Sequence, residues 1–258
     1  RTFGCPEAFG KYINKKYLSH TLASSDLSQA CLNEKFTLNK LKFSYYELQS
    51  RTSGKYGDHM PYMKELDIKG LRTVNVHHSP ILFLHKLSDA VHGYPENIFN
   101  SNKDWIETTI QILEARQQRY FVKIHPNEDN ASLVLKYLNK MKYGKTINSN
   151  LPVASVKNIS FGITRAGSIA AELAFLGVPI VCCADAPYSK MSFAYKPETI
   201  NEYRDILIKG FSTNEITRRR WKIDTLKYQY KHTICNQGLG PQAYDKVLAR
   251  NFFSKLYK

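Results

Sequence analysis

An α/β fold, with a Rossmann-like parallel sheet and helices on both faces, is predicted by three observations. Residues 159–183 have the order strand, tight turn, helix, strand, which is the crossover unit of a parallel sheet. A second strand and helix follow each other at residues 119–141. A chain of 258 residues is long enough to bury a full core around such a sheet.

Going from the N-terminus, the first strand that the pattern predicts covers residues 73–78 (TVNVHH). Ser79 and Pro80, which follow it, are expected to end it. A helix should follow at residues 101–118, because Ser101 and Asp104 form a capping box. The next strand covers residues 119–124, and its helix covers residues 131–141.

The stretch 159–203 organises the rest of the chain. Residues 159–164 are rich in β-branched and aromatic side chains, which predicts a strand, and a turn at 165–168 leads to a helix at 169–176. Gly177 ends that helix, and the apolar run 178–183 reads as a buried strand.

Helices are predicted in the last part of the chain. Thr199 and Glu202 form a capping box for a helix that Gly210 ends, and Ser212 and Glu215 repeat the signature before a helix to about His232. In that long helix the predicted apolar face consists of Ile216, Ile223, Leu226 and Tyr230. A final amphipathic helix is expected at residues 243–258.

Two regions are predicted: an N-terminal segment, residues 1–69, that is largely helical or irregular, and a Rossmann-like domain with C-terminal helices, residues 70–258. Within the first, residues 24–48 are candidates for helix and residues 50–57 for a loop. The chain does not begin with Met, which suggests a fragment of a longer protein.

Charge and cysteine content restrict the environment and the partners. The net charge of +15 favours anionic partners, such as nucleotides, phosphorylated sugars, lipid surfaces or nucleic acid. The five cysteines have no CxxC spacing, which indicates a reducing compartment and no metal site. No apolar run reaches the roughly 18 to 20 residues that span a bilayer.

Two predicted strand ends carry polar groups to the same edge of the sheet, where open α/β sheets bind their ligands. His125 follows one strand, and the turn 164–168 follows another. His125 is either a partly buried, backbone-bonded histidine or a donor to a phosphate or leaving-group oxygen. Ser168 is either an N-cap or a phosphate ligand, and Glu172, one turn later, is either solvated or within reach of a ribose hydroxyl. Of His77 and His78, at most one would face a site, since neighbours on a strand point to opposite faces.

Several ordered motifs resemble the capsule polysaccharide biosynthesis family of bacterial surface-glycan glycosyltransferases, which includes the Kdo transferases. They are KIHPNE at 123–128, TRAGSIAAELAFLGVPIV at 164–181, ADAPYSKMSFAYKPETINEY at 184–203, the Trp105 helix, and Asp89-Ala90 with Gly93-Tyr94-Pro95. The resemblance covers residues 70–210 and implies the C-terminal, donor-binding half of a GT-B enzyme, plus a partial N-terminal segment.

The resemblance implies a nucleotide-sugar site in which His125 and Ser168 hold the donor phosphate and Glu172 binds the ribose or base. The residues assigned to this site are Lys123, His125, Glu128, Thr164, Arg165, Gly167, Ser168 and Glu172. Such enzymes need no metal or other cofactor, and the nucleotide sugar, with a CMP-linked donor favoured, is a substrate.

The catalytic base is unknown from the sequence. An inverting transfer needs a carboxylate base, which the N-terminal domain of GT-B enzymes normally supplies. About 70 residues are too few for that domain, so Asp89 and Asp185 are guesses, and His125 is a candidate donor to the leaving group.

The function expected is transfer of a sugar, with Kdo from CMP-Kdo as one candidate, to a bacterial capsule or lipopolysaccharide acceptor or its lipid-linked precursor. The alternatives are a nucleotide-sugar epimerase of GT-B fold, and a non-catalytic basic module that binds anionic membrane or nucleic acid. Nothing resembles a nucleic-acid-binding motif, so nucleic acid is not expected. The expected location is the cytoplasm. Basic patches such as residues 218–220 are expected to bind the inner face of the inner membrane, as in a peripheral membrane protein.

Overall fold

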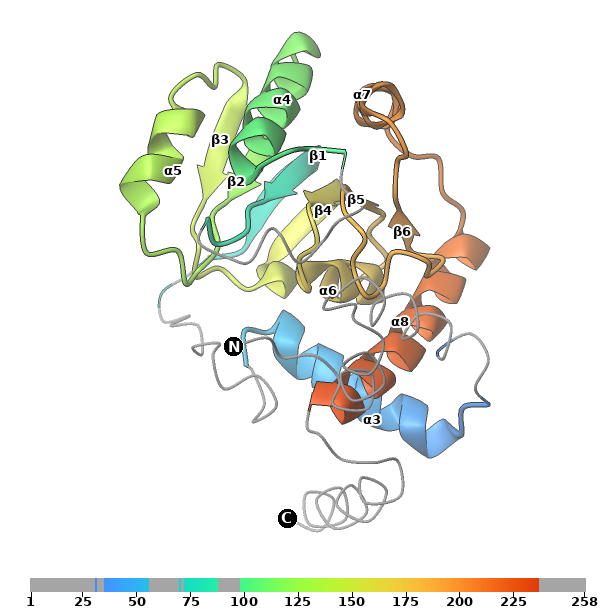
Figure 1. The fold of residues 1–258 in the computed structure, drawn as a ribbon. Coiled ribbons are helices and arrows are strands. Elements are labelled where there is room, and N and C mark those ends of the chain that lie inside the picture. Colours follow the sequence, from blue (N-terminus) through green and yellow to red (C-terminus); the bar gives the residue numbers. More distant parts are fainter. Residues whose placement is uncertain (1–30, 32–34, 56–69, 71, 88–97, 237–258) are drawn as a thin grey trace, which may run out of the picture.

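The fold is a six-stranded, all-parallel sheet flanked by helices (Figure 1). The computed structural model describes residues 31, 35–55, 70, 72–87 and 98–236. The strand order, β3-β2-β1-β4-β5-β6, is that of a doubly wound, Rossmann-like sheet. The predicted α/β class and parallel sheet are therefore confirmed. The strands are β1 (Val74–Phe83), β2 (Tyr120–Lys123), β3 (Gly144–Ile147), β4 (Val156–Thr164), β5 (Ile180–Cys182) and β6 (Ala194–Tyr195).

Helices cover both faces of the sheet. The α-helices are α3 (Leu38–Thr52), α4 (Asn102–Ala115), α5 (Ala131–Leu138), α6 (Ile169–Phe175), α7 (Ile200–Lys209) and α8 (Glu215–Asn236), with a short 3-10 helix, η2 (Val153–Ser155). Helices α4, α5 and α7 lie on one face, and α3, α6 and α8 lie on the other (Figure 1). Successive residues of one strand serve both cores, since Ile81 packs toward α6 and Leu82 toward α4.

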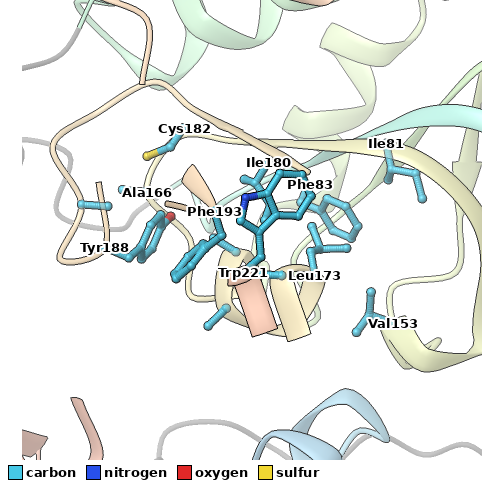
Figure 2. Close-up of a cluster of buried hydrophobic side chains, with 14 of the residues drawn as sticks. Ile81, Phe83, Val153, Ala166, Leu173, Ile180, Cys182, Tyr188, Phe193 and Trp221 are labelled. Atoms are coloured by element: carbon cyan, nitrogen blue, oxygen red, sulfur yellow. The ribbon is translucent and has the colours of Figure 1, made fainter. Parts of the chain in front are cut away.

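The core on the α6 side is the larger of the two clusters around the sheet. Figure 2 shows Phe83, Leu173 and Trp221 of this cluster, which come from β1, α6 and α8. Leu48 of α3 belongs to the same buried cluster, so α3 packs on the sheet-forming unit itself. Across the predicted boundary at residue 69, the helix of the N-terminal segment contributes to the core of residues 70–236.

The first strand is longer than predicted. It continues through Ser79 and Pro80 to Phe83, so the prediction that these two residues end it was wrong. Pro80 has no amide hydrogen to donate to a neighbouring strand. It is tolerated because β2 pairs with β1 only from Ile81 onward. His77 and His78 have φ of 50° and 58°, and the register of β1 against β4 shifts here, which indicates a bulge.

Most predicted helix boundaries follow from their caps. Ser101 accepts a hydrogen bond from the amide of Asp104, and Thr199 accepts one from the amide of Glu202, as the capping boxes predicted. Gly210 ends α7 at φ 69°, as predicted. The predicted loop at 50–57 was wrong in its first residues, which are the last turn of α3.

Helix α8 differs from its prediction at both its cap and its buried face. Asn214, and not Ser212, accepts the capping hydrogen bond, from the amide of Thr217. Ile216 and Ile223 are 79% and 48% exposed, so the predicted apolar face was wrong in these two positions. The helix instead buries Trp221, among others, because α6 covers that side of α8. The predicted helix at 243–258 lies outside the described residues.

Gly162 makes a backbone-to-side-chain contact that leaves no room for a side chain. A β carbon at this position in β4 would overlap Cδ1 of Leu173, which is fully buried in α6. We expect Gly162→Ala to lower the free energy of unfolding by about 1–3 kcal/mol, because the core is overpacked there. Urea denaturation followed by circular dichroism measures this, with the exposed Lys157→Ala in the same strand as the control. Equal stability of both variants would contradict the close α6–β4 approach.

Candidate functional site at the carboxyl edge of the sheet

The strand order reverses between β1 and β4, and this reversal defines where a ligand would bind. Strands β2 and β3 lie on one side of β1, whereas β4, β5 and β6 lie on the other. The chain therefore leaves β1 and β4 toward helices on opposite faces, α4 and α6, and open α/β sheets bind their ligands at such a reversal. The register pairs Phe83 with Lys123 and Leu82 with Ile163, so the three strand ends are level.

His85 lies at the centre of this edge. It follows β1 by two residues, as His125 follows β2 by two residues, and the two strands are paired up to Phe83 and Lys123. The Nε2 atom of His85 accepts a hydrogen bond of 2.9 Å from the amide of Ala166 and lies 3.3 Å from Oγ1 of Thr164. Because Nε2 is the acceptor, a neutral ring at this position carries its proton on Nδ1. His85 thus connects the ends of β1 and β4 across the reversal.

The turn between β4 and α6 is held in a fixed shape from both sides. Thr164 is buried, and its Oγ1 accepts a hydrogen bond of 3.2 Å from the amide of Gly167. The hydroxyl of Tyr188, from the loop after β5, donates to the carbonyl of Gly167 at 2.8 Å. A β carbon at Gly167 would lie 2.8 Å from Oγ1 of Thr164 and 3.4 Å from Nε2 of His85, so this position favours glycine.

Ser168 is exposed at the start of α6, and its side chain makes no capping hydrogen bond. Ser168 therefore occupies the N-cap position, as one of the two interpretations expected, although its hydroxyl does not cap the helix. Ser168 belongs to the same turn that His85 and Thr164 support through the amides of Ala166 and Gly167. Its hydroxyl is exposed at the carboxyl end of β4.

His125 lies in a tight turn after β2. The amide of Asn127 donates to its Nδ1 at 3.1 Å, so a neutral His125 carries its proton on Nε2. Both carboxylate oxygens of Glu128 accept backbone hydrogen bonds, from Leu87 at 2.7 Å and from Asn130 at 2.8 Å. Glu128 therefore connects the loop after β2 to the segment after β1.

Arg165 is buried and joins the turn after β4 to the segment between β1 and α4. It is 3% exposed, and its guanidinium donates to the side chain of Asn102 at 2.7 Å and to the carbonyl of Phe99 at 3.2 Å. Burial lowers its pKa, although an arginine remains charged at neutral pH. The side chain thus fixes the start of α4 against the turn after β4.

Glu172 and Lys123 belong to a buried charge cluster below the edge, on the α6 side of the sheet. Arg51 of α3 donates to Glu172 at 3.2 Å and to the side chain of Gln229 at 3.4 Å. Burial raises the pKa of Glu172, and the nearby Arg51 opposes the rise. Burial lowers the pKa of Lys123 to about 8, opposed by Glu172, and its Nζ donates to the carbonyl of Ser149 at 2.6 Å.

The structure brings together some of the predicted site residues and separates others. Thr164, Gly167 and Ser168 form the turn after β4, and His125 and Glu128 form the turn after β2, with β1 between the two strands. Lys123 and Glu172 lie beneath the edge, and Arg165 lies on the α4 side. A ribose role for Glu172 would require its pair with Arg51 to separate.

Of the two candidates for the catalytic base, the structure describes Asp185, and it also describes the pair His77 and His78. Asp185 is 4% exposed and accepts a hydrogen bond from Ser189 at 2.6 Å. Asp89 lies outside the described residues. His77 and His78 are exposed in the bulge near the amino end of β1, so neither of them lies at this site.

Two residues of this region were missed by sequence reasoning. His85 was overlooked because the predicted first strand ended at Pro80. The apolar run Ile81–Leu84, directly before His85, nevertheless signals a buried strand. Arg51 was placed in a loop, and no local pattern reveals a partner that lies 121 positions later in the chain.

Comparisons with known proteins add no relative. No protein-family model, no curated protein and no solved structure matches the chain. Within the described part of the chain, no helix is long and apolar enough to cross a membrane. The same residues contain no group of three or more His, Cys, Asp or Glu side chains that could hold a metal ion.

The contact between His85 and Ala166 predicts a difference between two substitutions. His85→Phe removes the acceptor and leaves the amide of the buried Ala166 without a partner, which should lower the free energy of unfolding by about 1–3 kcal/mol. His85→Gln can restore an acceptor and should lose less. Urea denaturation compares the two, and equal losses would contradict the role assigned to Nε2.

The Arg51–Glu172 pair predicts a pH-dependent loss. Arg51→Met leaves a buried carboxylate without its cation and should lower the free energy of unfolding by about 3–5 kcal/mol at neutral pH. The double variant Arg51→Met, Glu172→Leu removes that carboxylate as well and should recover much of the lost stability. Burial raises the pKa of Glu172 in the folded state, so the folded single variant holds a proton that the unfolded chain has released. The free energy of unfolding of this variant therefore falls as the pH rises from the unfolded pKa through the folded pKa.

Denaturation of the Arg51→Met variant should therefore show a smaller deficit near pH 5 than near pH 8. The double variant serves as the control, because it has no carboxylate at position 172 and its deficit should not change in this way. A deficit of the single variant that grows toward acid pH would contradict the assignment.

Proposed function

We propose that this chain is the donor-binding part of a metal-independent glycosyltransferase of GT-B type, which takes its sugar from a nucleotide sugar. The observation that carries the proposal is the convergence of three strand ends at the reversal of the sheet. There His125, His85 and the turn 164–168 follow neighbouring strands. Rossmann-like sheets bind nucleotides at this position.

The chemistry of the edge suits a phosphate-linked ligand. The neutral form of His125 carries its proton on Nε2, which can donate to a phosphate oxygen. Ser168, in the loop after β4, offers a hydroxyl. These groups would bind the diester or diphosphate of the donor.

In the proposed reaction, the bond between the anomeric carbon and the phosphate oxygen breaks while an acceptor hydroxyl forms the new bond. The leaving phosphate takes the electron pair, and hydrogen-bond donors such as His125 would stabilise its charge. The proton of the acceptor hydroxyl passes to a carboxylate base, which is not assigned here. The buried Asp185 is poorly placed for that role because it is bonded to Ser189.

The resemblance of residues 70–210 to capsule polysaccharide biosynthesis proteins supports the same class and a bacterial surface glycan or its lipid-linked precursor as acceptor. It favours a CMP-linked donor such as CMP-Kdo. The expected place of action is the cytoplasmic side of the cell, where nucleotide sugars are available.

Calorimetric titration with CMP, CDP, UDP and GDP tests the proposal. One nucleotide should bind selectively, and both His125→Asn and Ser168→Ala should weaken it by about 1–3 kcal/mol, as expected for lost hydrogen bonds to a charged group. Asparagine at position 125 can still accept the hydrogen bond from the amide of Asn127, so the turn is kept while the Nε2 donor is lost.

The matched control is His78→Asn, which changes an exposed histidine near the amino end of β1 at a positive φ that asparagine tolerates. It should bind like the wild type. Failure of all four nucleotides to bind the wild type, or equal weakening by the control, would contradict the proposal.

A further inference from the structure

The outer surface formed by α3, the end of α6 and the first turns of α8 combines exposed apolar and basic side chains. On α3, Tyr45 and Tyr46 are 44% and 53% exposed, and their rings are in edge contact at 5.7 Å. Tyr45 also contacts Phe175, the last residue of α6, at 5.3 Å. The next residue, Leu176, is 37% exposed.

The same surface continues from α6 to α8. A β carbon at Gly177 would lie 3.8 Å from the side chain of Lys222 and 3.9 Å from that of Arg218, so both cations lie beside the end of α6. Ile216 and Ile223 are exposed and form one stripe of α8, at a spacing of seven residues. At 3.6 residues per turn, this stripe lies between Arg219 and Arg220 and about 100–160° around the helix from Lys222 and Arg218.

The cations of this surface outnumber its acidic groups. Exposed lysines and arginines are contributed by both helices: Lys42 by α3, and Arg218, Arg219, Arg220 and Lys222 by α8. Glu215 is the exposed acid of the first turn of α8, and it is paired with Arg219. Asp224, which lies near Arg220 at 3.8 Å, is buried and hydrogen-bonded to Ser192.

We propose that this α3–α8 surface binds a lipid bilayer that carries anionic headgroups. Exposed isoleucine, leucine and tyrosine can enter the boundary between headgroups and acyl chains, while arginine and lysine remain at the phosphate level. Lysine and tyrosine at positions 42, 45 and 46 face outward together because they are three and four residues apart on α3. The mixture of charge and apolar side chains favours a bilayer over a purely polar anion.

This surface is separate from the candidate nucleotide site. The site lies at the carboxyl ends of β1, β2 and β4, whereas Leu176 and Gly177 follow the far end of α6. The membrane proposal therefore does not depend on the proposed enzymatic function. Nucleotide binding and vesicle binding can succeed or fail independently.

Vesicle co-sedimentation of the full chain tests the proposal. The wild type should bind vesicles of phosphatidylcholine with about 30% phosphatidylglycerol and should not bind phosphatidylcholine alone. The triple variant Arg218→Gln, Arg219→Gln, Lys222→Gln should lose about a hundredfold in partitioning, because each cation at an anionic surface contributes about fivefold. The double variant Ile216→Ser, Ile223→Ser should also bind more weakly, because it loses two apolar side chains that would enter the bilayer.

The charge-matched control replaces Lys103, Lys136 and Lys145 with Gln; these exposed lysines lie on α4, α5 and β3, on other parts of the surface. It should bind vesicles like the wild type, and all variants should have unchanged circular dichroism. Equal loss in the control would overturn the proposal, as would wild-type binding by the triple or the isoleucine variant. Binding to a single-stranded oligonucleotide in place of anionic vesicles would also overturn it.

Discussion

The pairing of β1 with β4 determines where the other strands and the candidate site lie. Strand β1 accepts β2 on one side, and the chain returns to its other side to add β4. All six strands are parallel, so their carboxyl ends share one edge, and the loops after β1 and β4 leave in opposite directions. The hydrogen bond from Ala166 to His85 spans this point and joins the two loops.

The polar groups around the edge fall into two sets with different physical roles. Arg165, Glu172 and Lys123 are buried and hydrogen-bonded to Asn102, Arg51 and Ser149, respectively. These bonds hold α4, α3 and the loop before η2 in place. Ser168 is exposed, and His125 is partly exposed, on the loops that leave β4 and β2. Buried, paired charges position the backbone, and the accessible groups above them remain candidates for ligand contact.

The sequence predicted the sheet well because its signals are local. The apolar run at 178–183 and the strand–turn–helix of 159–176 need no information from elsewhere in the chain, and β4, α6 and β5 appear where they were expected. The caps of α4 and α7 were recognisable because both partners are three residues apart.

The predictions that failed depend on contacts distant in sequence. Pro80 continues a strand because of where β2 begins, and Ile216 is exposed because nothing among the described residues covers the first turn of α8. The short strands β3 and β6 were not predicted, since four and two residues carry too little periodicity. The partner of Glu172 lies on α3, which no local pattern connects to α6.

Nucleotide binding at the carboxyl edge between β1 and β4 can be tested by the amide NMR spectrum of the chain during addition of CMP, CDP, UDP or GDP. One nucleotide should shift the amides of Ala166, Gly167 and Ser168, together with those of the loop at His125. It should leave the amide of Lys157, at the opposite end of β4, unchanged. No shift with any of the four, or shifts confined to the amino edge of the sheet, would contradict it.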